Sequence, residues 1–237
     1  MSIKENQIQV LDLTIDIVKK DIKNMHLAVY PPTGRIRIAS PKGLNDEAIR
    51  LFAISKIRWI KKNQKSFYNQ LREPQREYID GESHYFDGKR YLLKVIERNG
   101  KHEIRIANKK YLELYINPNT KTEAREKVFS EWYRKHLKEI TPSILDSWAD
   151  KIGVVYNSWD IKLMRTKWGS CNIEKKKIII NLELAKKPRY CLEYIVAHEL
   201  THLLERNHND IFKGHLDRYM PNWRANKREL NNLPIGS

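Results

Sequence analysis

The chain is poor in cysteine, since its 237 residues include only Cys171 and Cys191. Two isolated cysteines make no disulfide framework and lack the C-x-x-C spacing of a thiolate metal site, which favours a reducing cytoplasm. The sequence also lacks an uninterrupted apolar run of about 18 residues, so no transmembrane helix is expected. Residues 1–20 lack the pattern of a signal peptide. These absences predict a cytoplasmic protein with no membrane partner.

Acidic residues are outnumbered by basic ones. The chain has 45 lysines and arginines against 29 aspartates and glutamates, which gives a formal net charge of +16. The basic residues are spread over the whole sequence, and such a field attracts polyanions, so nucleic acid and nucleotides are candidate partners. The alternative is that the charges only solvate the surface, because charge alone carries no specificity.

The strongest chemical signal is the H-E-x-x-H motif His198-Glu199-Leu200-Thr201-His202. Apolar residues at helical spacing, without Gly or Pro, predict a helix over residues 190–205. Residues four apart lie on one face of a helix, so His198 and His202 can bind one metal ion. Glu199 lies next to them, where it can act as general base on a water activated by the metal. The alternative is a surface helix with two chance histidines.

A catalytic zinc site needs a third protein ligand and keeps one position open. His208 supplies it in a spacing that resembles H-E-x-x-H-x-x-G-x-x-H, except that Glu205 stands in the Gly position. The chain is expected to leave the helix at Arg206-Asn207, because Asn tolerates a left-handed C-cap. The sequence therefore predicts one zinc ion per chain, bound by the three histidines.

Residues 1–118 predict a β-rich region with one long helix. The helix is expected over residues 47–71 and carries a basic face. Alternating apolar and polar residues, bounded by turn signals, predict strands at 8–17, 25–30, 35–39, 78–81, 83–86, 90–97, 103–107 and 111–116. No internal repeat is visible in the sequence.

Residues 119–237 are expected to form a second domain. A long helix is predicted from residue 120 or 122 to about 151, kinked or split at Pro142. Strands at 158–166 and 177–182 flank an expected turn at 168–172, and the strand directly before the metal-site helix is expected to edge the active cleft. Short helices are predicted after His208 and after Pro221. The fold class is therefore α+β.

Further motifs surround these elements: Arg165-x-x-Trp168-Gly169-Ser170-Cys171, Ile180-Asn181-Leu182, and Asn207-His208 after the H-E-x-x-H segment. Through them the chain resembles the YgjP-like metallopeptidase family, which is similar to the WLM and SprT-like minimal zinc peptidases. The resemblance spans nearly the whole chain and is most specific over residues 165–208. It implies a minimal zincin-like metallopeptidase domain in which His198, His202 and His208 bind the metal and Glu199 is the catalytic acid/base. Several family members are found beside type I restriction–modification systems.

Further residues are candidates for binding substrate or for supporting the metal ligands. Arg165 can bind a carboxylate or phosphate through two hydrogen bonds, and Trp168 can shape the cleft. His215 either approaches the metal from the next helix or lies at the surface. Tyr219 either donates to an oxyanion or only packs. Arg206 either caps the helix or contacts substrate.

The leading function is zinc-dependent hydrolysis of peptide bonds, in association with nucleic acid or a restriction–modification system. One alternative is a metal-dependent hydrolase of nucleoside triphosphates, although the sequence lacks a P-loop and a carboxylate cluster for Mg²⁺. Another is a zinc-stabilised nucleic-acid-binding accessory protein. Glu199 argues against it, because a structural zinc site has no use for a base.

Overall fold

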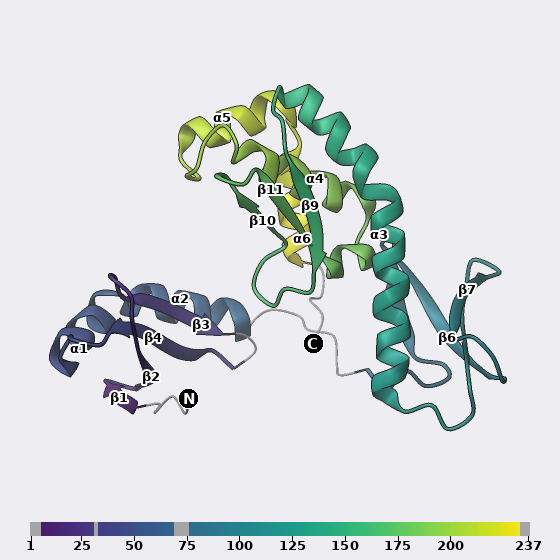
Figure 1. Ribbon diagram of the computed structural model, residues 1–237, viewed down its shortest axis with the longest axis horizontal. Coiled ribbons are helices and arrows are strands. Elements are labelled where there is room, and N and C mark those ends of the chain that lie inside the picture. The colour runs from purple at the N-terminus through teal and green to yellow at the C-terminus, as the bar shows by residue number, and fades with distance from the viewer. Residues whose placement is uncertain (1–5, 31–32, 69–75, 233–237) are drawn as a thin grey trace. The chain divides into compact units, whose positions relative to one another are not determined.

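The computed structural model of the chain describes residues 6–30, 33–68 and 76–232 (Figure 1). It is a mixed α+β fold, as predicted, and it divides into two compact units, Met1–Gln70 and Leu71–Ser237. Each unit has its own hydrophobic core. The boundary expected between residues 118 and 119 falls inside the second unit, because the strands before it share one core with the helices after it. Among the described helices, none combines the length and apolar composition that a membrane span needs.

The first unit is a four-stranded sheet that packs against two helices. Its strands are β1 (Asn6–Val10), β2 (Leu13–Lys20), β3 (His26–Tyr30) and β4 (Arg35–Pro41), in the order β1-β2-β4-β3 with β2 and β4 parallel. The single strand expected over residues 8–17 is instead a hairpin of β1 and β2, because Leu11 turns the chain with a φ of 53°.

The helix expected over residues 47–71 is two helices, α1 (Asp46–Ser55) and α2 (Ile57–Tyr68), and the residues expected to continue it lie outside the described residues. The break follows Ser55, whose hydroxyl donates to the carbonyl of Phe52 at 2.8 Å. A serine side chain that bonds to the backbone of the preceding turn competes with the helical hydrogen bonds. No Gly or Pro in the sequence indicates this break.

The second unit begins with another four-stranded sheet. Its strands are β5 (Ser83–Phe86), β6 (Lys89–Glu97), β7 (Glu103–Ala107) and β8 (Tyr111–Ile116), in the order β5-β6-β8-β7 with β6 and β8 parallel. Residues 78–81, expected as a strand, are an irregular segment and a turn instead, and Tyr78 has a φ of 56°. The strand order and the pairing sense repeat those of the first sheet, a structural repeat that the sequence does not reveal.

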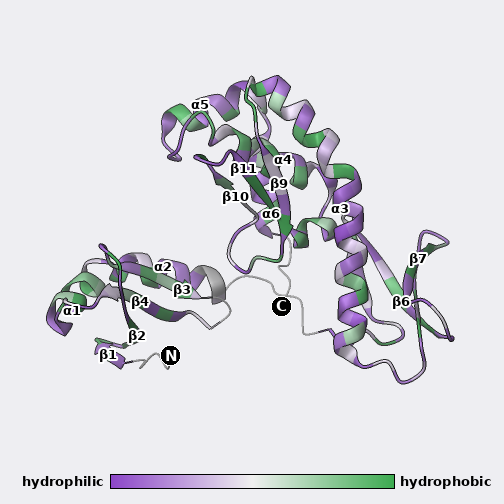
Figure 2. Cartoon of the chain, in the orientation of Figure 1, coloured by the Kyte–Doolittle hydropathy of each residue, from purple (hydrophilic) through white to green (hydrophobic). Residues whose placement is uncertain are grey.

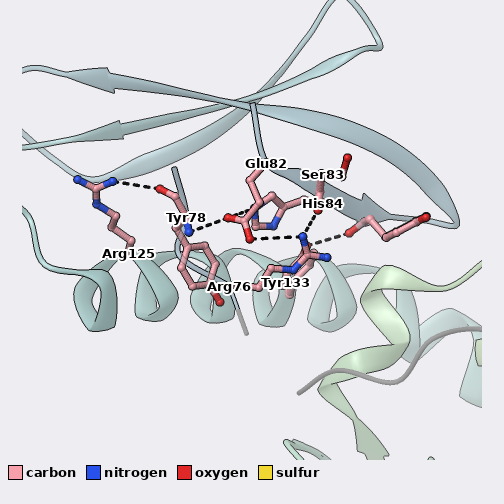
Figure 3. A network of polar contacts seen from close by, with 8 residues as sticks. Arg76, Tyr78, Glu82, Ser83, His84, Arg125 and Tyr133 are labelled. Atoms are coloured by element: carbon pink, nitrogen blue, oxygen red, sulfur yellow. Dashed lines mark hydrogen bonds and ion pairs between the residues drawn. The ribbon is translucent and has the colours of Figure 1, made fainter. Parts of the chain in front are cut away.

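Polar contacts fasten the chain before β5 to the long helix α3 (Thr122–Ile152), as Figure 3 shows. Glu82 accepts the backbone N–H of Tyr78 at 2.6 Å, and its carboxylate lies 3.3 Å from Nε2 of the buried His84. Arg125 of α3 donates to the carbonyl of Tyr78 at 3.0 Å. These bonds connect the sheet of β5–β8 to the helix that reaches the functional site.

Helix α3 runs unbroken through Pro142, where the sequence predicts a kink or a split, and Figure 1 shows it bending along its length. Proline removes one N–H donor without ending the helix here, because packing supports both sides. Bands of hydrophobic and hydrophilic residues alternate along α3 (Figure 2). Phe129, Leu137 and Leu145 lie in the core of the second unit.

The second unit also contains a three-stranded sheet. Its strands are β9 (Ser158–Lys162), β10 (Gly169–Asn172) and β11 (Lys177–Asn181), in the order β10-β11-β9. Two predictions are wrong here. The expected turn at residues 168–172 contains edge strand β10, and β11, expected to edge the cleft, lies in the middle of the sheet. The turn comes later, where Lys176 has a φ of 47°.

The remaining elements are the short 3-10 helix η1 (Leu182–Lys186) and helices α4 (Arg189–Thr201), α5 (Asp210–Tyr219) and α6 (Trp223–Asn232). Helix α4 packs against α3, α5, α6, β10 and β11. Burial on all these sides explains why its apolar residues are not confined to one face.

Candidate metal centre

Three imidazoles meet at the end of α4. His198 lies in its last turn, His202 is its C-cap and His208 follows in the segment before α5. Their ligand atoms lie within 4.8 Å of one another, and the Nε2 atoms of His198 and His208 are 2.9 Å apart. Zinc–nitrogen bonds of about 2.0–2.1 Å in a tetrahedral arrangement separate such atoms by roughly 3.3 Å. The three side chains therefore fit one ion after a small adjustment.

The chain leaves α4 differently from the prediction. The helix ends at Thr201, and none of the described residues between it and the third histidine takes the left-handed conformation expected at Asn207. Instead, the N–H groups of Leu203 and Leu204 donate to the carbonyls three residues earlier, at 3.0 Å each. The carboxylate of Glu205 then accepts the N–H of Asn207 at 2.9 Å. The tightened last turn, together with the carboxylate of Glu205 in the motif's Gly position, thus brings the chain back towards His198 and His202.

Hydrogen bonding and packing orient the imidazoles. Nδ1 of His202 lies 3.1 Å from the carbonyl oxygen of Glu205, which can accept its proton and leave the Nε2 lone pair for a metal. Nδ1 of His198 is buried and has no hydrogen-bond partner among the described residues. Phe212 of α5 packs against all three rings, with centroid distances of 4.7 to 4.9 Å.

Burial keeps these imidazoles neutral. Burial, followed by the charges of His202, His208 and Lys227, lowers the pKa of His198 to about 3. Burial also lowers the pKa of His202 and of His208. Only a neutral imidazole donates a lone pair to a metal, so the cluster has the protonation state that metal binding requires.

Glu199 is buried against edge strand β10 and is 6% exposed. Burial raises the pKa of its carboxyl to about 8, opposed by the cation of Lys167 and a hydrogen bond from the backbone N–H of Cys171. A nearby cation favours the ionised carboxylate, so a bound metal lowers this pKa. Gly169 permits the close approach, because a Cβ there would lie 2.7 Å from both Cγ and Oε1 of Glu199. The sequence motif around Trp168 contains Gly169 but predicts no role for it.

The side chain of Asn181 holds the loop before β10. Its amide donates to the carbonyls of Met164 and Lys167 at 2.8 and 2.7 Å, and its oxygen accepts the N–H of Met164 at 3.3 Å. The backbone N–H of Asn181 donates to the carbonyl of Trp168 at 3.0 Å. The motif around Asn181 thus fixes the segment that carries Lys167 and Trp168 to the site.

The three histidines and Glu199 line a cavity of about 920 Å³. Trp168 lies in its wall, as do all three histidines and Glu199. Within the described residues, the lining does not include Arg165, which is exposed. It does not include His215 or Tyr219 either, which stack on each other along α5 with their ring centroids 6.2 Å apart. Lys227 of α6 joins the lining, although no pattern in the sequence singles it out.

The sequence pattern of one protein family matches residues 23–233, and this family is described as YgjP-like, metallopeptidase domain. No curated protein sequence matches the chain.

Two solved structures are similar to part of the chain. One is the crystal structure of the metallopeptidase zymogen of Pyrococcus abyssi abylysin, with 16% sequence identity and a TM-score of 0.36, covering 38% of this chain and 91% of that one. The other is the crystal structure of the metallopeptidase zymogen of Methanocaldococcus jannaschii jannalysin, with 21% identity and a TM-score of 0.34, again covering 38% of this chain and 91% of that one.

Proposed function

Because the chain belongs to the YgjP-like metallopeptidase family, we propose that it hydrolyses peptide bonds with one zinc ion, held by His198, His202 and His208. Family membership makes the chain a metal-dependent hydrolase of peptides or proteins. The choice of zinc and the role of each residue are the proposal. The main support for this proposal is the convergence of three neutral imidazoles, because three nitrogen ligands leave a tetrahedral zinc ion with one open position.

Glu199 is the general base of this proposal. When bound, zinc supplies Lewis-acid chemistry that polarises the scissile carbonyl and lowers the pKa of water. Glu199 takes the proton of the attacking water and passes it to the leaving amine. The backbone N–H of Cys171 and the missing Cβ of Gly169 support this position of the carboxylate.

Edge strand β10 is the proposed place for the substrate backbone. Within the described sheet its neighbour is β11 on one side, which leaves its other edge unpaired. An extended peptide can add to such an edge by main-chain hydrogen bonds. β10 also lines the cavity that contains the histidines, so a peptide paired with it lies beside the proposed metal.

Metal analysis and peptide hydrolysis test the proposal together. Purified wild type should carry about one zinc per chain and cleave an unfolded protein. His202→Ala should lose both properties, whereas His26→Ala, an exposed residue of β3, should keep both. Glu199→Gln retains an acceptor for the N–H of Cys171 but cannot take a proton. It should keep zinc and lose about 10²–10⁴-fold in rate. Full activity of Glu199→Gln, or equal zinc in the two histidine variants, would overturn the proposal.

A further inference from the structure

Cations from separate parts of the chain line the cavity around the histidines. Lys167 precedes β10, Arg206 lies in the turn after α4, and Lys227 lies on α6. All three side chains are exposed, and none forms an ion pair with an acidic side chain of the described residues. Elements far apart in the sequence thus converge to place unpaired positive charges around one cavity.

Lys167, Arg206 and Lys227 line the same cavity as the three histidines and Glu199. A substrate in this cavity therefore lies close to the three cations, and charge interactions over a few ångströms are only partly screened.

Few acidic groups offset these cations. The acidic side chains of the lining are Glu199, which is buried, and Glu174, which is exposed in the turn after β10. Three exposed cations therefore face one exposed carboxylate, and the accessible wall of the cavity is positive.

We propose that the cavity selects peptide substrates with aspartate or glutamate side chains close to the scissile bond. The inference rests on the proposed function, since it names the substrate class of the same site. Lys167 approaches from the side of β10 and Lys227 from the side of α6, so acidic residues on either side of the scissile bond gain a partner. Removing the charge of each cation should lose roughly a two- to fivefold preference, as expected for exposed ion pairs.

An acidic peptide fits this wall better than a nucleic acid. A cavity of about 920 Å³ accommodates a few amino-acid residues, since small-ligand pockets measure about 300–1,000 Å³. Specific binding of duplex DNA needs roughly 1,000–2,500 Å² of protein surface. The unpaired edge of β10 is also suited to a polypeptide backbone.

Hydrolysis of matched peptides tests the preference. The peptides differ only at the residues flanking the cleaved bond, which are neutral in one and glutamate in the other. Wild type should cleave the glutamate peptide with about tenfold higher kcat/KM at low salt, and the difference should shrink at about 1 M salt. Lys167→Gln, Arg206→Gln and Lys227→Gln should each reduce this ratio. The matched control Lys138→Gln removes the same charge from an exposed site on α3 outside the cavity and should leave the ratio unchanged.

Binding to the inactive Glu199→Gln variant separates this inference from the proposed function. The labelled glutamate peptide should bind more tightly than the neutral one, by the same ratio within about a factor of two. Equal cleavage of both peptides overturns the inference and leaves the proposed function standing. Tight binding of the glutamate peptide without cleavage of any peptide by wild type removes the proposed function and leaves the binding preference.

Duplex DNA is the third arm of this experiment. If DNA displaces the glutamate peptide at physiological salt, and Lys138→Gln weakens binding as much as Lys227→Gln, the charge acts as a general polyanion field. That result overturns the inference. Failure of DNA to compete supports it.

Discussion

Replacing Gly169 with alanine measures how closely β10 must approach α4. The added Cβ would lie 2.7 Å from Cγ and Oε1 of Glu199 and 2.8 Å from Cγ2 of Ile195. Cβ atoms in proteins essentially never approach another heavy atom closer than 3.0 Å. Neither neighbour can swing into solvent, because Glu199 is 6% and Ile195 5% exposed. The strand, the helix or the carboxylate must therefore move by several tenths of an ångström.

The substitution should lower both the stability and the activity. Overpacking in a filled interior costs about 1–3 kcal/mol, which is the expected fall in the free energy of unfolding. Misplacing a catalytic group by about 1 Å can cost about 10²-fold in rate, or roughly 2.7 kcal/mol of activation free energy. Gly214→Ala is the matched control. Its added Cβ meets nothing within 4 Å, and alanine is favoured inside a helix such as α5.

Urea unfolding, metal analysis and peptide kcat/KM should be measured on both glycine variants. Gly169→Ala should keep its zinc, because the three atoms nearest the added methyl group belong to Glu199 and Ile195, and should lose most of its rate. Gly214→Ala should match wild type in rate. A folded Gly169→Ala protein with wild-type kcat/KM would refute the reasoning that this approach positions Glu199. Loss of zinc would refute it as well, because the disturbance would then act through the ligands.

Two further predictions concern Cys171 of β10, Cys191 of α4 and Asn181 of β11. Burial raises the pKa of Cys171 to about 11 and that of Cys191 to about 12. At pH 8 the thiols should therefore react with a disulfide reagent more slowly in folded than in unfolded protein, by about a hundredfold for Cys171 and about a thousandfold for Cys191. Equal rates would contradict this burial. Asn181→Ala removes the bonds to Met164 and Lys167, each worth about 1 kcal/mol, and should lower kcat/KM and the urea midpoint but not the zinc content. An unchanged midpoint would show that the loop is held by other contacts.

The proximity of the histidines could be predicted because it is local. The helical period brings His198 and His202 together whatever the rest of the chain does, and a short exit segment keeps His208 near. The exit itself could not be predicted. The sequence favours a left-handed residue at Asn207. Helix α4 instead ends with hydrogen bonds to the carbonyls three residues earlier, and the carboxylate of Glu205 accepts the N–H of Asn207. The roles of these residues in catalysis stay predictions until the variants are measured.

Features that depend on distant partners could not be predicted from the sequence. The Gly-Ser-Cys-Asn sequence of β10 has no alternation, and its strand conformation comes from pairing with β11. Lys227 is one of 45 lysines and arginines, and only the packing of α6 against α4 brings it to the cavity. The nucleotide and nucleic-acid alternatives still rest on charge alone, since the family match concerns a metallopeptidase domain.

The two four-stranded sheets show why topology can repeat where sequence does not. In both, the turn between the first two strands uses a residue with positive φ, Leu11 at 53° and Asp87 at 47°. Alternation and turn position specify such a sheet, and neither requires particular residue identities. What the sheets pack against is different. The second sheet and the segment before it cover α3, where Phe129 stacks on His84 and Tyr133 donates to the carbonyl of Tyr85 at 2.8 Å.

This packing explains why the expected boundary between residues 118 and 119 falls inside one unit. A chain beginning there would keep the proposed metal ligands but expose the faces of Phe129 and Tyr133 that the sheet of β5–β8 covers. Each such ring contributes about 1.5–3 kcal/mol by its burial. Because α3 also packs against α4, the loss would reach the helix that carries His198 and Glu199. The β-rich segment therefore supports the proposed metal centre through α3, although none of its residues lines the cavity among those the structure describes.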